Sequence, residues 1–153
     1  AVKRTEAAVG YCTLCGEAGG GVAPRVECEQ RLVYELADAF NETSAESSPV
    51  IPTAVIGKEP SAELRSGQVD EEELPPYEVL DPILEQYIEE RGTTRSIREG
   101  YPDHVVDEVL RRTTNGEFKR RQTPSPLRIT RKALGRGWNY PIAAAYDHVL
   151  DSR

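Results

Sequence analysis

The chain has 153 residues, which suits one domain, and only 38% of them are hydrophobic, so we expect a modest core. Its formal net charge is −7, which argues against a generally basic nucleic-acid-binding protein. No stretch approaches the roughly 18 consecutive apolar residues of a membrane-spanning helix, and no signal-like segment opens the sequence. We therefore expect a cytoplasmic protein with no membrane partner.

The first residues bear on whether the chain is complete. Met occurs nowhere in the sequence, so Ala1 is not an unprocessed translation start. A helix-like pattern is already under way at Glu6, which favours a piece cut from a longer protein over a chain with its own start.

Two helices and a strand are expected in the first third of the chain. Apolar residues at helical spacing predict a short helix over residues 4–15, which Gly16 ends. A brief strand is expected at 22–24. A second amphipathic helix is predicted over 29–41 by the spacing of its apolar residues, Leu32, Val33, Leu36, Ala37 and Phe40.

The middle of the chain contains the strongest helix pattern. One helical turn is expected at 52–56 and an extended loop at 58–64, because Pro60 disfavours helix just before it. Asp81 is expected to cap the strong helix, with Pro82 at its first helical position. An apolar stripe then runs to the stop at Gly92 and consists of Ile83, Leu84, Tyr87 and Ile88.

A short helix near 94–99, a stop at Gly100 and a helix over 103–112 superficially match a helix-turn-helix. The second helix would have to approach phosphates and base edges with its first turns. These turns carry carboxylates, Asp103, Asp107 and Glu108. We therefore expect no nucleic-acid partner.

Cationic residues are concentrated near the C-terminus. Seven of them lie between Glu117, the single carboxylate of this stretch, and Tyr140. Two interpretations stay open, a local anion site suited to phosphate groups and a solvated tail. The stretch after Thr123 is rich in Pro, Gly and Arg, and a last helix is expected over 141–149.

The three cysteines are an odd number and are expected to be reduced intracellular thiols. Cys12 and Cys15 form a Cys-x-x-Cys pair, with Cys28 as a third thiol and His104 or His148 as a fourth zinc ligand. A second Cys-x-x-Cys pair is missing and both histidines are remote in sequence. Buried or incidental thiols are therefore favoured over a zinc site.

Several short strings, spread over almost the whole chain, carry a family resemblance. They are Glu6-Ala-Ala-Val-Gly-Tyr-Cys-Thr-Leu14, Leu32-Val-Tyr-Glu-Leu-Ala37, Ser48-Pro-Val-Ile-Pro52, Pro60-Ser-Ala-Glu-Leu64, Leu74-Pro-Pro-Tyr-Glu-Val-Leu-Asp81, Glu117-Phe-Lys-Arg-Arg-Gln122 and Thr130-Arg-Lys-Ala-Leu-Gly135 with Pro141-Ile142. In this order they resemble the C-terminal half of the synthetase domain of glutamine-dependent NAD synthetases.

The resemblance implies an α/β fold: the mainly helical, C-terminal portion of a Rossmann-like domain of the adenine nucleotide alpha hydrolase-like, ATP-pyrophosphatase type. Most of its sheet would lie upstream, leaving one or two short strands here. The chain, residues 1–153, then divides into a substrate and ATP-site half, residues 1–64, and a helical region with a basic tail, residues 65–153.

The resemblance also implies an activity, that of a ligase of NAD biosynthesis. ATP and Mg²⁺ activate the nicotinate carboxylate of deamido-NAD as an adenylate, and ammonia derived from glutamine displaces AMP to give NAD. Glu6 matches the acidic residue that serves the magnesium and deamido-NAD site. Ser61 matches a hydroxyl that contacts ATP, and Lys119 matches a lysine that contacts deamido-NAD. We expect a homo-oligomer.

Departures from the family pattern concern the ATP site. The family's Ser-Gly-Gly-x-Asp-Ser loop, whose backbone N–H groups cradle pyrophosphate, is absent, as is the nitrilase-like domain that supplies ammonia. Gln30 stands where a phosphate-contacting lysine is usual, Cys15 where Tyr is usual and Glu17 where Asp is usual. We therefore expect the isolated chain to be inactive. The alternative is a truncated, non-catalytic relative that acts as a dimerisation or interaction module.

Overall fold

Helices make up most of the regular structure in the computed structural model, which describes residues 2–45, 48–62, 64–135 and 137–143. The α-helices are α1 (Arg4–Val9), α2 (Gln30–Thr43), α3 (Thr53–Ile56), α4 (Tyr77–Leu84), α5 (Thr94–Arg98), α6 (Asp103–Asn115) and α7 (Glu117–Arg120). The other elements are a 3₁₀ turn η1 (Asp70–Glu72), a π-helical segment η2 (Glu85–Glu89), and strands β1 (Val22–Ala23) and β2 (Ser125–Pro126).

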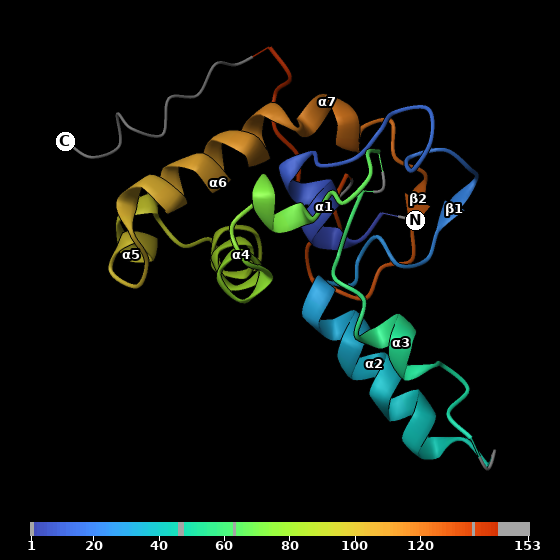
Figure 1. Ribbon diagram of the computed structural model, residues 1–153. Helices are drawn as coiled ribbons and strands as arrows, with labels where there is room; N and C mark the ends of the chain where they lie inside the picture. The colour runs from blue at the N-terminus through green and yellow to red at the C-terminus, as the bar shows by residue number, and fades with distance from the viewer. Residues whose placement is uncertain (1, 46–47, 63, 136, 144–153) are drawn as a thin grey trace.

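The short helix α1 lies at the centre of the structure and contacts α4, α6 and α7 (Figure 1). Four of its six residues, Thr5, Ala7, Ala8 and Val9, have small side chains, and all of its residues except Glu6 are buried. Small side chains let three helices approach α1 closely, so a helix of six residues is held by its neighbours and not by its own length. Glu6 is the residue of α1 that keeps some exposure.

The predicted helix over 4–15 is too long, because α1 ends at Val9. Gly10 follows with a φ of +68°, a left-handed conformation that caps the helix. A Cβ on Gly10 would lie 2.9 Å from the Cα of Gly116, just after α6. Gly10 therefore both ends α1 and permits the close approach of α1 to the end of α6.

Replacing Gly10 by alanine should destabilise the chain by about 2–4 kcal/mol, since the new Cβ adds backbone strain and a clash with Gly116. Gly67→Ala is the matched control, because Gly67 has a φ of +71° but open space around its Cβ position. Gly67→Ala should lower the free energy of unfolding by about 1–2 kcal/mol, because it adds the strain of a left-handed backbone but no clash. Urea unfolding of both variants measures the difference, and equal losses would contradict the close approach.

The strong helix begins earlier than predicted. α4 starts at Tyr77, after Pro76, so Asp81 is not its cap and Pro82 lies inside it. Two buried side chains, Tyr77 and Leu80, extend the apolar stripe by one turn towards the N-terminus. Asp81 is buried and accepts hydrogen bonds from the Thr5 hydroxyl and the Arg31 backbone N–H. Asp81 before Pro82 therefore looks like a helix cap in the sequence, but its carboxylate instead joins α4 to α1 and α2.

α2 and α3 form an arm that projects from the other helices (Figure 1). The predictions of helix over 29–41 and of one turn at 52–56 are confirmed within two residues. The side chain of Asn41 ties the arm together, since its amide bonds the backbone of Ile51 twice, at 2.9 Å each. Two residues of the apolar stripe of α2 are exposed: Leu36 is 53% exposed and Phe40 is 55% exposed.

The described strands are β1 and β2, which pair in parallel over two residues, with Val22 opposite Ser125. This agrees with the expectation of one or two short strands in a mainly helical chain.

The predicted helices near 94–99 and 103–112 are confirmed as α5 and α6. The helix expected over 141–149 lies largely outside the described residues. No described helix is long and apolar enough to cross a membrane.

Candidate functional site

Glu6 lies in the first turn of α1, where its carboxylate faces Lys3. One oxygen accepts the Lys3 backbone N–H at 2.9 Å, and the other pairs with the Lys3 ammonium at 2.7 Å. Burial raises the pKa of Glu6, Lys3 opposes that rise and the charge of Asp70 adds to it. Glu6 therefore caps its own helix through one oxygen and holds a single cation through the other.

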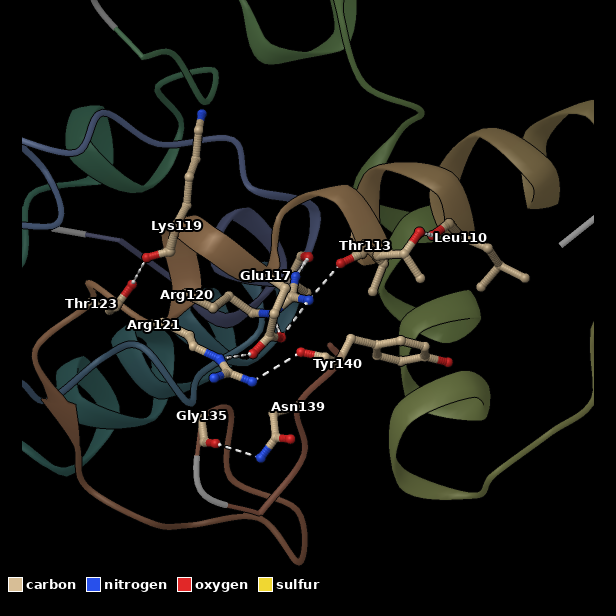
Figure 2. Close-up of polar contacts among 12 residues, drawn as sticks. Leu110, Thr113, Glu117, Lys119, Arg120, Arg121, Thr123, Gly135, Asn139 and Tyr140 are labelled. Carbon is tan, nitrogen blue, oxygen red and sulfur yellow. Dashed lines mark hydrogen bonds and ion pairs between the residues drawn. The ribbon is translucent and has the colours of Figure 1, made fainter. Parts of the chain in front are cut away.

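Lys119 lies on α7 and reaches the other end of α1. Its ammonium donates to the carbonyl oxygens of Gly10 at 2.7 Å and Cys12 at 3.0 Å. Figure 2 shows its side chain extending away from Glu117 and Arg121. The structure thus places Glu6 and Lys119 at opposite ends of α1, with no hydrogen bond or ion pair between them in the described part of the chain.

Ser61 lies in the connection between α3 and η1, next to a backbone hydrogen bond that anchors this connection. The Asp70 N–H donates to the carbonyl oxygen of Pro60 at 2.9 Å, and the Asp70 carboxylate accepts from the Tyr77 hydroxyl at 2.7 Å. Burial, then this hydrogen bond, raises the pKa of Tyr77. The segment of Ser61 is therefore attached to α4, which itself packs on the helix of Glu6.

Asp70 is a residue that sequence reasoning missed. The sequence shows it only as the first of several acidic residues before Pro75, a pattern typical of solvated loops. In the structure it is buried, and one of its carboxylate oxygens has no hydrogen-bond partner among the described groups. The available sign that Asp70 is buried was its position just before the string Leu74-Pro-Pro-Tyr77, which carries part of the family resemblance.

The cations of the basic stretch differ in burial: Arg120 is built into the fold, whereas Arg121, Arg128 and Arg131 are exposed. The Arg120 guanidinium is buried and donates to the Glu117 carboxylate at 3.0 Å and to the carbonyl oxygens of Ala8 and Thr113. Arg121 binds the other Glu117 oxygen at 2.8 Å, so one carboxylate serves two cations (Figure 2). The solvated-tail interpretation is wrong for Arg120.

Aromatic rings fasten the segment after β2 onto this ion cluster. The Trp138 ring lies 5.0 Å from the Arg120 guanidinium carbon and packs edge-on against Tyr87 and Tyr140 at 6.0 and 5.1 Å between ring centres. The hydroxyls of Tyr87 and Tyr140 are hydrogen-bonded to each other. The C-terminal segment is thereby attached both to α7 and to η2.

Two clefts of opposite charge border this region. One, of about 960 Å³, is lined by arginines from α7 and the segment after β2. The other, of about 420 Å³, is lined largely by glutamates, Glu27, Glu29, Glu85, Glu89 and Glu90. Burial and the nearby Asp81 charge raise the pKa of Glu29 to about 7. The clefts are therefore suited to ligands of different charge.

The described residues include no group of three or more His, Cys, Asp or Glu side chains that could hold a metal ion. The cysteines are free thiols, with Cys12 and Cys28 buried and Cys15 exposed.

Gln30 is buried, and its side-chain oxygen has no hydrogen-bond partner among the described groups. Position 30 therefore holds a neutral, buried side chain whose hydrogen bonding is incomplete among the described groups.

The NAD synthase family model matches residues 2–123. Glutamine-dependent NAD(+) synthetase of Synechocystis sp. is 41% identical over 145 residues, 94% of this chain and 25% of that protein. The enzyme of the same description from Acinetobacter baylyi is 44% identical over 141 residues, 92% of this chain and 26% of that protein.

A solved structure of glutamine-dependent NAD+ synthetase from Acinetobacter baumannii, in complex with ADP, is 38% identical. The match covers 92% of this chain and 24% of that one, with a TM-score of 0.44. The chain thus spans about a quarter of the length of the relatives it matches. On the extent of the family match and on the identity with these relatives, the chain belongs to the NAD synthase family.

Proposed function

We propose that the chain is the C-terminal part of the synthetase domain of a cytoplasmic, glutamine-dependent NAD synthetase. This ligase would use ATP, Mg²⁺ and ammonia from glutamine to convert deamido-NAD to NAD. The observation that supports the proposal is that Glu6 and Lys119, which we propose as residues of the dinucleotide site, contact the two ends of one buried helix. A single rigid element would then set their spacing.

Glu6 suits Mg²⁺ only as part of a shared site. It offers one carboxylate, so phosphate oxygens and water would have to complete an octahedral shell. When bound, Mg²⁺ would offset the charge of the pyrophosphate leaving group. Lys119 would bind the anionic dinucleotide, and the Ser61 hydroxyl would donate a hydrogen bond to ATP.

The isolated chain should make no NAD, because it lacks the family's Ser-Gly-Gly-x-Asp-Ser loop. A chimera tests the proposal: this chain replaces the matching C-terminal region of the Acinetobacter baylyi synthetase, with which it shares 44% identity. We expect glutamine-dependent conversion of deamido-NAD to NAD by the chimera and none by the chain alone. Gln30→Lys should raise turnover, since it restores a phosphate-binding charge. A folded chimera without turnover would refute the proposal.

The exposed arm supports a second candidate function, a dimerisation module. Leu36 and Phe40 on α2 and Val55 on α3 leave apolar surface in solvent. We expect the chain to sediment as a homo-oligomer and Phe40→Glu to shift it towards monomer. The control is Ile129→Glu, which changes a residue of similar exposure, 58%, outside the arm. A monomeric parent chain, or equal effects of both changes, would exclude this role.

A further inference from the structure

The cleft of about 960 Å³ lies beside the β1–β2 pair, and its lining combines a cationic wall, made of arginines, with apolar residues. Four arginines line it, Arg120, Arg121, Arg128 and Arg131, and its described lining includes no Asp or Glu. Val26 and Leu134, which are buried, are among the apolar residues of the lining. The chain as a whole has 26 acidic and 19 basic residues, so a cleft lined by one sign of charge is a local feature of the fold.

Two of these guanidinium groups are held in place by the surrounding chain. Arg121 donates to Glu117 and to the carbonyl oxygen of Tyr140 at 3.0 Å. Arg128 donates to the carbonyl oxygens of Thr130 at 3.2 Å and Arg131 at 2.8 Å. Each guanidinium has more N–H donors than these bonds use, so both can bind a further acceptor while their orientation is already restricted.

The charge of this wall is only partly neutralised. Glu117 is shared between Arg120 and Arg121, which leaves a net positive charge on the cluster. Arg128 is bonded to carbonyl oxygens and has no ion pair with a described carboxylate. Arg131 also lines the acidic cleft, so Arg121 and Arg128 are the better anchors for a ligand.

We propose that this cleft binds a small anion bearing two or more phosphate groups, through Arg121 and Arg128. Planar guanidinium forks match phosphate oxygens in pairs, and two hydroxyl residues, Thr123 and Ser125, also line the cleft. Glu6, Ser61 and Lys119 do not line the cleft, so this site is additional to the proposed synthetase site. A long nucleic acid is disfavoured, because the acidic cleft next to Arg131 would repel its continuing backbone.

Isothermal titration of the chain with inorganic tripolyphosphate, without Mg²⁺, tests the site. We expect one binding event that weakens with added salt and loses about tenfold in affinity in Arg128→Ala. Arg128→Lys keeps the positive charge but not the guanidinium fork, so its affinity for tripolyphosphate should lie between those of Arg128→Ala and the parent chain. Arg95→Ala, an exposed arginine of α5 that does not line the cleft, is the control and should bind like the parent chain.

Absence of binding, or equal affinity of Arg128→Ala and the parent chain, would overturn the proposal. Tighter binding of a single-stranded oligonucleotide that displaces tripolyphosphate would also overturn it, in favour of a nucleic-acid surface. Arg121→Ala tests the other proposed anchor and should also lower the affinity, and circular dichroism confirms that each variant is folded. The test measures binding and needs no turnover, so a failure of this proposal can be distinguished from a failure of the proposed synthetase function.

Discussion

Glu117→Ala should destabilise the chain by about 3–5 kcal/mol, the largest loss that we expect from a single substitution. The Glu117 side chain is 1% exposed and is the carboxylate of both Arg120 and Arg121. Its removal would leave the buried Arg120 guanidinium with carbonyl oxygens and the Trp138 ring but no counter-charge. Because Arg120 binds the carbonyl oxygen of Ala8, the loss should extend to the packing of α1.

Urea unfolding at neutral pH measures this effect, and two variants serve as controls. Glu117→Gln keeps the shape and one oxygen acceptor, so it should lose less than Glu117→Ala. Glu72→Ala breaks the exposed ion pair with Arg65 and should cost less than about 1 kcal/mol. If Glu117→Ala were no worse than Glu72→Ala, the buried cluster would not be a main support of the fold.

Glu6→Gln in the chimera should lower turnover by about a hundredfold or more, since Gln cannot supply the negative charge proposed to hold Mg²⁺. The amide keeps an oxygen that can accept the Lys3 backbone N–H, so the cap of α1 should survive. We therefore expect the loss of activity without a comparable loss of stability. This combination separates a metal-binding role from a structural one.

The control for Glu6 is Glu78→Gln, which neutralises an exposed carboxylate in the first turn of α4. It should leave turnover within about twofold of the unsubstituted chimera. Initial rates over a range of Mg²⁺ concentrations are the measurement. Full activity of Glu6→Gln at low Mg²⁺ would remove Glu6 from the proposed magnesium site, whereas the family membership of the chain would stand.

Much of the fold follows from patterns between near neighbours in sequence. The spacing of apolar residues predicted the helices over 29–41, 94–99 and 103–112, because helix periodicity is a local property. The brief strand at 22–24 also was correctly placed. The family followed from ordered strings and is confirmed by the match over residues 2–123. The roles of Glu6, Ser61 and Lys119 came from that resemblance and stay predictions.

Errors occurred where distant contacts decided the local structure. α1 ends early because Gly10 meets Gly116, and α4 starts early because Tyr77 and Leu80 are buried and Asp81 binds α1 and α2. Contacts between residues that are distant in sequence leave no periodic pattern of apolar residues in the sequence. At the end of α1 the capping glycine is Gly10 and not Gly16, whereas at the start of α4 tertiary packing was stronger than the local capping pattern of Asp81 and Pro82.

The sequence by itself determined the family, the order of the helices and the concentration of cationic residues near the C-terminus. Only the tertiary structure decided which of those cations are buried and which line a cleft. Arg120 is separated by 112 residues from Ala8, whose carbonyl oxygen it binds, whereas Arg128 stays at the surface. Charge is a property of each residue, but the burial and pairing of a charge depend on segments that only the folded chain brings together.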